Sequence, residues 1–384
     1  MNDTRFKVCF CLLVQVIFIQ GTNRDNTLVA VLMVKNEAPV IEQTLQPFID
    51  GGIRSYFIFD TGSTDNTQVV AKNFFKRHGI TNAYVIEEPF IDFATSRNRA
   101  LDLTEQYFPG ALFMLMFDAE WHLHNIEGLL QFCEQERNAT NKAYLIRILS
   151  SLDFYVGRLL RCKSGARFSG VVHEAVSAQK RVPSDIFFEL RTTKYGAKKS
   201  RQRWVRDCEK LLAEHHKNPT NSRTVFYLAQ TYECLGELEL ALYWYSMRKD
   251  LGGWDQENFV TVYRLGRLCE KLGRRTGDQH WSEQAIEYYM QAYWMRPCRI
   301  EPLVQMAIQS WDQQQFELSF FCAYIAAVAP YPQDVLFIEK PLYDFTRYDL
   351  LRRAARKCKR YAVVRWAKKQ IKKGKQKIFT LPST

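Results

Sequence analysis

The stretch FIFDTGSTDNT (Phe57 to Thr67) joins an apolar run to a turn of small polar residues. The run ends at Asp60, and a second acid, Asp65, follows five residues later. This pattern is typical of a buried strand, a tight turn and the start of a helix. Phosphate-binding loops are rich in Gly and Lys, whereas two carboxylates would repel a phosphate. Carboxylates accept hydrogen bonds from a uracil N–H and from ribose hydroxyls, so the turn is predicted to bind a nucleoside.

Apolar runs and helical periodicity alternate on both sides of this turn, from about residue 28 onward. Continuous apolar runs with helices between them indicate a mostly parallel sheet that is covered on both faces. The expected fold class is therefore α/β, with a Rossmann-like sheet domain. Strands are predicted at 28–34, 55–59, 83–86, 111–117, 142–149, 152–162 and 185–190, and helices at 38–52, 64–79, 92–108 and 125–135.

Polar clusters follow the first four predicted strands. Open α/β sheets bind their ligands at the carboxyl ends of the strands, where these clusters fall. Any one cluster could be turn chemistry, because Asp, Ser and Thr also cap helices. Four clusters on one rim predict a nucleotide site instead. The clusters are KNE (35–37), DTGSTD (60–65), DFATSRN (92–98) and DAE (118–120), and the nucleotide-binding residues expected from them are Glu37, Asp60, Asp65, Arg97 and Asp118.

The DAE cluster offers two carboxylates two residues apart, Asp118 and Glu120. Hard oxygen ligands suit Mg²⁺ or Mn²⁺ that bridges phosphate oxygens. His173, in RFSGVVHEAV, is either a packed or surface residue or the third ligand, and an imidazole ligand would favour Mn²⁺. Arg97 and Arg99 are expected to supply further positive charge to a diphosphate.

A carboxylate near such a site could also act as a general base. Glu174 is the first candidate for this base, and Asp153 and Asp92 are its rivals. If VVHE were an extended strand, His173 and Glu174 would point to opposite faces. A turn after Gly170 is therefore predicted, which would let both side chains converge.

From about residue 200 onward the sequence pattern predicts helices alone. Small residues and aromatics recur at matching positions in 226–249 and 263–297, with a weaker third copy at 301–330, as in tetratricopeptide repeats. Such a solenoid binds partners or braces the sheet domain, and it also offers a surface for a homodimer. The predicted domains are an apolar segment (1–27), the sheet domain (28–200), the helical domain (201–350) and a basic helix or tail (351–384).

Charge is concentrated at the carboxyl end of this 384-residue chain. The net charge is +12, and thirteen Lys or Arg with no acid lie between Arg352 and Lys377. Such a segment is either a solvated helix face or a contact for an anionic membrane surface. No nucleic-acid partner is expected.

Cysteine usage and the amino end bear on location. Ten scattered cysteines without zinc spacing favour the reduced thiols of a cytoplasmic protein over the alternative, a secreted disulfide framework. Association of the cytoplasmic protein with a membrane is a further expectation. The apolar segment Phe6 to Gln20 is short for a spanning helix. It is interpreted as a signal or anchor segment, or as a packed arm.

The linked motifs LMVKNEAPVIEQTL, FIFDTGSTDNT, DFATSRNRAL, FDAEW and FSGVVHEAV resemble those of family 2 glycosyltransferases of the GT-A fold, over roughly residues 28–180. With the helical repeats, the chain resembles glycosyltransferases that carry a C-terminal tetratricopeptide-type region, including bacterial peptide S-glycosyltransferases. The resemblance implies a nucleotide-diphosphate sugar donor, a divalent metal and an inverting displacement. It also implies roles for individual residues: Asp60 and Asp65 at the nucleoside, Arg97 near the phosphates, Asp118 and Glu120 at the D-x-D motif, and His173 in the metal shell.

Two positions depart from the family pattern. Glu120 replaces the second aspartate of D-x-D, and Trp121 replaces the acid that often follows it. The second change makes Glu174 the stronger candidate for the base. The expected activity is hexosyl transfer from a nucleotide-diphosphate sugar, UDP-linked by preference, to a protein, peptide or glycan. The alternative is a non-catalytic scaffold whose sheet domain has degenerated.

Overall fold

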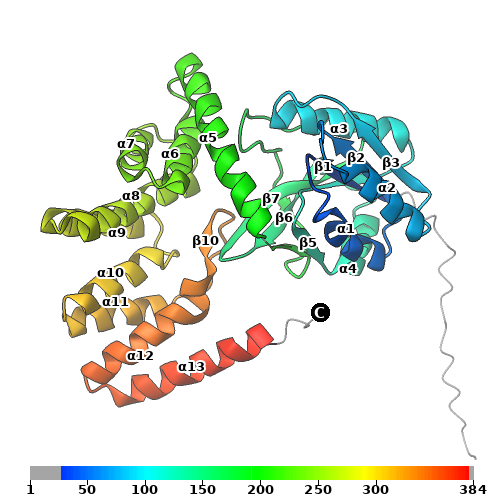
Figure 1. Ribbon diagram of the computed structural model, residues 1–384. Helices are drawn as coiled ribbons and strands as arrows, with labels where there is room; N and C mark the ends of the chain where they lie inside the picture. Colours follow the sequence, from blue (N-terminus) through cyan, green and yellow to red (C-terminus); the bar gives the residue numbers. More distant parts are fainter. Residues whose placement is uncertain (1–26, 192, 380–384) are drawn as a thin grey trace, which may run out of the picture.

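The computed structural model describes residues 27–191 and 193–379. It consists of a sheet region and a helical region, which follow one another along the chain (Figure 1). The predicted apolar amino-terminal segment lies outside the described residues, except for Thr27. No helix of the described part is both long and apolar enough to cross a membrane.

One half of the sheet is parallel and is built by the predicted apolar runs. Strands β1 (Leu28–Val34), β2 (Ser55–Asp60), β3 (Asn82–Glu87) and β4 (Phe113–Phe117) pair in the order β3-β2-β1-β4. Their parallel alignment brings the carboxyl ends of all four strands to one edge. Val34 and Asp60 are register partners there, so the predicted clusters after β1 and β2 are neighbours.

Helices cover both faces of this half, as the alternating pattern predicts. α1 (Ile41–Asp50), α2 (Thr67–Arg77) and α4 (Ile126–Gln135) share one buried core with the sheet. α3 (Phe93–Tyr107) packs against the other face. The ring of Phe48 in α1 stacks on Phe117 at the end of β4, with 4.2 Å between centroids, which fixes α1 beside the carboxyl end of that strand.

The other half of the sheet contains both parallel and antiparallel pairs, so the predicted parallel arrangement is complete only in β1–β4. β7 (Leu152–Arg161) runs antiparallel to β4 and to β6 (Ala143–Leu149). Two residues join β6 to β7, which is too short for the crossover that parallel strands need. The order continues through β9 (Phe187–Leu190) to β5 (Trp121–His124), a four-residue strand that was not predicted, and β8 (Lys180–Arg181) pairs with β6.

The helical region consists of consecutive helices in an arc from α5 to α13 (Figure 1). Small residues lie where helices touch, as the repeat pattern predicts: a side chain at Gly266 of α8 would come within 2.6 Å of Tyr289 of α9. The helices are α5 (Lys194–Lys217), α6 (Ser222–Leu235), α7 (Leu238–Lys249), α8 (Asp255–Thr276), α9 (Gln279–Met295), α10 (Glu301–Asp312), α11 (Phe316–Val328), α12 (Arg347–Lys357) and α13 (Tyr361–Phe379), with a π-helical turn at Leu342–Thr346.

The two regions are joined by more than the chain itself. Helix α5 runs across residue 200, where the sequence-based domain limit lies. Strand β10 (Ile338–Glu339), which follows α11 in the chain, pairs antiparallel with the start of β7. Tyr155 N donates to Val335 O at 2.8 Å beside this pairing. The helical region therefore adds backbone hydrogen bonds to the sheet.

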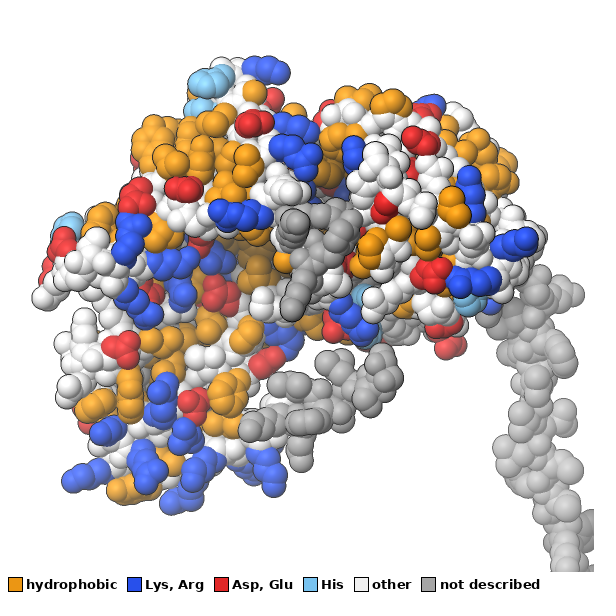
Figure 2. Space-filling model, in the orientation of Figure 1, with side chains coloured by type: hydrophobic (Ala, Val, Ile, Leu, Met, Phe, Trp, Pro, Cys, Tyr) orange, Lys and Arg blue, Asp and Glu red, His pale blue; other side chains and the backbone are white. Residues whose placement is uncertain are grey.

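The predicted basic segment folds into α12 and α13. Figure 2 shows Lys and Arg side chains gathered over this end of the molecule, at the lower left. Arg356, Lys359, Arg365 and Lys368 are among those exposed to solvent. The expectation of an anionic membrane partner for this segment remains a prediction.

Candidate active site

Four charged side chains meet at the carboxyl end of β4. Arg97 donates from Nη2 to Asp118 Oδ1 at 2.5 Å and from Nε to Glu174 Oε1 at 2.6 Å. Arg158 Nη2 lies 3.5 Å from Asp118 Oδ2 and 3.6 Å from Glu174 Oε1. Two guanidinium groups and two carboxylates thus share one site, which we call the charged cluster.

Neighbouring elements place these groups together. Asp118 directly follows β4, and Arg158 lies on β7, the antiparallel neighbour of β4. Arg97 belongs to α3, whose start is fixed by Asp92: its Oδ1 accepts from Thr95 N at 2.7 Å. The predicted rival base Asp92 is therefore a helix cap, with both carboxylate oxygens bonded to Thr95.

Two aromatic rings, those of Phe168 and Trp121, help to shield the two arginines from water. Both guanidinium groups lie near the ring of Phe168, Arg97 at 5.9 Å and Arg158 at 5.3 Å from its centroid. Arg158 also lies 5.3 Å from the ring of Trp121. The two arginine side chains are only 4% and 9% exposed. Charges removed from water interact more strongly than surface charges do.

Electrostatics keeps Asp118 ionised. Burial raises the pKa of this carboxyl group, but attraction to Arg97 and Arg158 outweighs it, so the pKa is below its ordinary value. Burial, followed by repulsion from Arg97, lowers the pKa of Arg158. Each arginine still holds a buried Nη1 that has no hydrogen-bond partner among the described residues. These two donors are available to an anion.

Asp60 has the geometry expected of a ligand-binding acid. The residue is fully buried, and its Oδ1 accepts from Gly62 N at 3.0 Å and from Ser63 N at 2.8 Å. Its Oδ2 is buried and has no hydrogen-bond partner within residues 27–191 and 193–379. One oxygen therefore shapes the turn, and the other remains as an acceptor.

Asp65 instead links two loops of the rim. Its Oδ1 accepts from the backbone N and the hydroxyl of Thr67, and its Oδ2 accepts from Ala38 N at 3.2 Å. Thr67 Oγ1 in turn accepts from Glu37 N at 2.8 Å. The structure places the predicted residues Glu37 and Asp65 on the rim, but the described bonds of Asp65 hold the loops together rather than leave it open to a nucleoside.

The segment after Gly170 is a turn, as predicted. Paired backbone bonds between Ser169 and Ala175, at 2.9 and 3.0 Å, close it, and Gly170 (φ 107°) and His173 (φ 52°) adopt left-handed conformations. The expected convergence of His173 and Glu174 is wrong. Glu174 points to Arg97, whereas the ring of His173 stacks on Tyr227 of α6, with 4.0 Å between centroids and 13° between planes.

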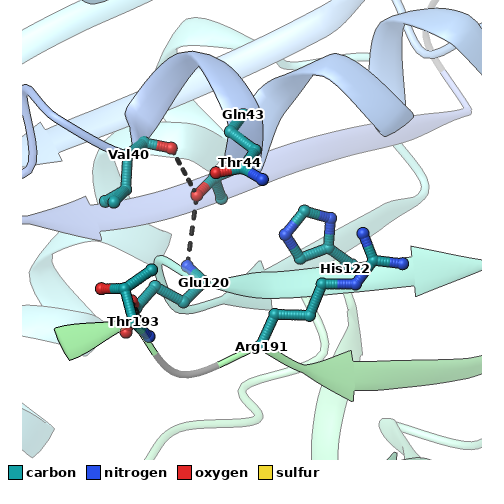
Figure 3. A pocket seen from close by; sticks show the side chains of 7 residues that line it. All are labelled: Val40, Gln43, Thr44, Glu120, His122, Arg191 and Thr193. Carbon is teal, nitrogen blue, oxygen red and sulfur yellow. Dashed lines mark hydrogen bonds between the residues drawn. The ribbon is translucent and has the colours of Figure 1, made fainter. Parts of the chain in front are cut away.

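Glu120 also points away from the charged cluster. Its Oε1 accepts from Thr193 N at 2.8 Å, at the start of α5, and its backbone N donates to Thr44 Oγ1 at 3.2 Å. A side chain at Gly196 would come within 2.0 Å of Glu120 Oε2. The acid is therefore enclosed by the first turn of α5. Figure 3 shows it beside Thr193.

The predicted metal ligands do not form one shell in this arrangement. Asp118 is paired with two arginines, Glu120 with the start of α5, and His173 with an aromatic ring. The described residues contain no group of three His, Cys, Asp or Glu side chains that could hold a metal ion. The donor set therefore does not fit the expected Mn²⁺ or Mg²⁺ as it stands.

A small pocket of about 220 Å³ opens beside Glu120, between α1 and the antiparallel strand pair β5–β9 (Figure 3). The side chains of His122, on β5, and Arg191, directly after β9, lie next to one another on the side of the pocket opposite α1. Burial, followed by repulsion from Arg191, lowers the pKa of His122, so this imidazole is neutral at pH 7. The pocket is lined by Val40, Gln43, Thr44, Glu120, His122, Arg191 and Thr193.

Two other predicted residues are occupied elsewhere. Asp153, the second candidate for the base, is buried at the start of β7, where Arg147 binds both of its oxygens and Tyr331 donates to Oδ2. Asp153 therefore links the sheet to the helical region and is not part of the charged cluster. Arg99 forms a two-bond ion pair with Glu88 on the surface, so it does not contribute to the cluster.

Sequence reasoning missed Arg158. It stands in LDFYVGRLLRC, a run interpreted only as an apolar strand. A lone arginine flanked by apolar residues in a buried strand is a signal in itself, because such a charge needs a partner. Which partner it has depends on the antiparallel pairing of β4 and β7, and the sequence pattern does not show that pairing.

Comparisons with known proteins give fold-level likenesses only. No protein family profile and no curated protein matches the chain. Among solved structures, the mannosyltransferase PcManGT from Pyrobaculum calidifontis, in complex with GDP-Man and Mn²⁺, is 15% identical with a TM-score of 0.39, and the match covers 70% of this chain and 87% of that one. The MamA protein is 15% identical with a TM-score of 0.37, over 49% of this chain and 91% of that one. At these TM-scores the likenesses show nothing about the function of this chain.

Proposed function

We propose that this chain is a glycosyltransferase that moves a sugar from a nucleotide-diphosphate sugar, UDP-linked by preference, to a protein, peptide or glycan acceptor with inversion. The observation that carries the proposal is the charged cluster. Arg97 and Arg158 each keep a buried Nη1 that none of the described residues pairs with, at the edge where four parallel strands end. Buried guanidinium donors are suited to a diphosphate.

Asp60 supports a nucleotide as the ligand. Its buried Oδ2, which accepts no hydrogen bond from the part of the chain that the structure describes, lies at the end of β2, on the same edge of the sheet as Asp118. An acceptor there suits a base N–H or a ribose hydroxyl. Leaving such an oxygen buried without a partner costs stability, so a ligand that donates to it would bind favourably.

The proposed reaction is a single displacement. An acceptor hydroxyl or thiol attacks the anomeric carbon, the bond from that carbon to the diphosphate oxygen breaks, and the diphosphate leaves with the electron pair. Arg97 and Arg158 stabilise the charge that develops on the diphosphate. Glu174 takes the acceptor's proton; its Oε1 is anchored to Arg97, and none of the described residues donates a hydrogen bond to its Oε2.

No step is assigned to a metal ion, because Asp118, Glu120 and His173 face different partners. The assays below are therefore run both with Mn²⁺ and with EDTA. The two conditions show whether the charged cluster acts by itself or needs added positive charge.

The test is UDP binding by calorimetry, followed by nucleotide-sugar hydrolysis and transfer, for the parent and for Glu174→Gln. We expect the parent to bind UDP and to release it from a UDP-sugar. Glu174→Gln should keep UDP affinity within about threefold and lose transfer by about a hundredfold. If the parent binds neither UDP nor GDP in either condition, the proposal fails and the scaffold alternative replaces it.

A second outcome reassigns Glu174. If Glu174→Gln lost UDP affinity and transfer together, its role would be to orient Arg97 for the diphosphate. If transfer stayed at the parental rate, Glu174 would not be the base.

A further inference from the structure

The turn that carries Glu174 has two sides. Glu174 faces the charged cluster. The residues just before it face the helical region: Val172 is part of the buried core formed by α5–α9, and Val171 packs against that core. A five-residue turn (170–174) thus spans the boundary between the two regions.

Two residues of α6 hold this turn. The ring of Tyr227 lies flat against His173, with 4.0 Å between centroids. Arg223 donates from Nη2 to His173 O at 3.3 Å, and its guanidinium group lies 4.8 Å from the centroid of the Tyr227 ring. Arg223, Tyr227 and His173 therefore form a stack, and His173 is the residue directly before Glu174 in the chain.

The stack is anchored deeper in the helical region. Arg223 Nη1 donates to Glu257 Oε1 of α8 at 2.7 Å. Glu257 is buried and also lies 3.4 Å from Arg248 Nη2 of α7, which is itself fully buried. Buried ion pairs of this kind resist displacement because breaking one leaves an unpaired charge. The position of His173 O is thereby tied to three helices.

We propose that Tyr227 and Arg223 are positioning residues for Glu174, so that the helical region is part of the catalytic apparatus. The proposal rests on the glycosyltransferase function proposed above. A catalytic group acts only within a narrow range of positions, and a displacement of about 1 Å can cost about a hundredfold in rate. The turn contains Gly170 and has no regular secondary structure, so it needs an outside support to hold Glu174.

The test compares variants that remove the stack with variants that keep it. We expect Tyr227→Ala and His173→Ala to lower kcat by about tenfold to a hundredfold, with the Kd for UDP within about threefold of the parent. Tyr227→Phe keeps the ring and should retain kcat. Truncating the buried Tyr227 opens a cavity in the core, whereas the exposed His173 can be truncated without opening one.

Matched controls separate positioning from a general loss of stability. Tyr243→Ala removes an exposed tyrosine from α7, away from the turn, and should leave kcat unchanged. In a Glu174→Gln background, His173→Ala should add less than about twofold, because both changes act through the same carboxylate. Additive losses, or a parental kcat in His173→Ala, would overturn the proposal.

His173→Ala also decides between positioning and metal binding. If His173 only supports the turn, the Mn²⁺ concentration that gives half-maximal activity should not change. If that Mn²⁺ concentration rose in His173→Ala, His173 would be a metal ligand, and the proposed role of the stack would be overturned.

A readout without turnover keeps this proposal apart from the proposed function. Hydrogen exchange at the Ala175 amide, which closes the turn by donating to Ser169 O at 3.0 Å, should accelerate at least about tenfold in His173→Ala. Accelerated exchange in a protein that shows no UDP binding or transfer would retain the support of the turn and reject the glycosyltransferase. Unchanged exchange would reject the support itself.

Discussion

Arg158 Nη2 lies 3.6 Å from Glu174 Oε1, although the two residues come from a central strand and from a turn that contacts the helical region. The same atom lies 3.5 Å from Asp118. Arg158 thus belongs to the charged cluster, although the sequence motifs indicated only the other three residues of that cluster.

Removing the charge of Arg158 should weaken nucleotide binding. Arg158→Met keeps most of the aliphatic volume but removes a buried donor, so UDP affinity should fall about tenfold to a hundredfold, as for a hydrogen bond to a charged group. Calorimetry at constant salt measures the change. Arg77→Met, at a half-exposed arginine on α2, is the control and should bind UDP normally. Equal affinity in both variants would exclude Arg158 from the diphosphate site.

Asp60→Asn tests whether Oδ2 of Asp60 binds the nucleoside. The amide keeps an oxygen for Gly62 N and Ser63 N, so the turn should survive, but Nδ2 replaces the unpaired acceptor. UDP affinity should fall at least about tenfold, because a donor would then face a donor. Inorganic diphosphate, which lacks the nucleoside, should bind as tightly as to the parent. A parallel loss for both ligands would indicate a disturbed turn instead.

Glu120 should contribute to stability through α5. Its carboxylate accepts from Thr193 N at the amino end of that helix, where negative charge is favourable. Glu120→Ala should lower the free energy of unfolding by about 0.5 to 2 kcal/mol, the range for a lost cap, measured by urea denaturation. Glu209→Ala removes an exposed acid from the same helix and should have little effect. No difference between the two variants would contradict the capping role.

The basic helix α13 tests the predicted anionic membrane partner. Reversing the charge of exposed Lys368 and Lys369 should weaken binding to phosphatidylserine vesicles at least about tenfold, since each basic side chain near such a surface contributes about 1 kcal/mol. Co-sedimentation at physiological salt measures this. The same reversal at Lys72 and Lys76 of α2 is the control. If the parent stays in solution with these vesicles, the basic segment is a solvated face.

Local pattern was enough to predict several features of this protein. Apolar runs predicted β1–β4 because a buried parallel strand is apolar along its whole length. The small residue Gly266 and the aromatic Tyr289 marked a helix contact because a close approach needs one partner without a side chain. The left-handed positions Gly170 and His173 agree with the predicted turn. Asp118 and Arg97 were identified as site residues because each follows a strand of the sheet.

Tertiary structure decided what those side chains face. Whether Glu120 turns to Asp118 or to Thr193 depends on where α5 begins in space, some 70 residues further along the chain. Whether His173 meets a metal or Tyr227 depends on how α6 packs against the turn. Arg158 reaches Asp118 only because β7 runs antiparallel to β4. Sequence periodicity reports which face of an element is buried, whereas a partner is set by elements distant in the chain, so the motifs located the site and the packing assigned its contacts.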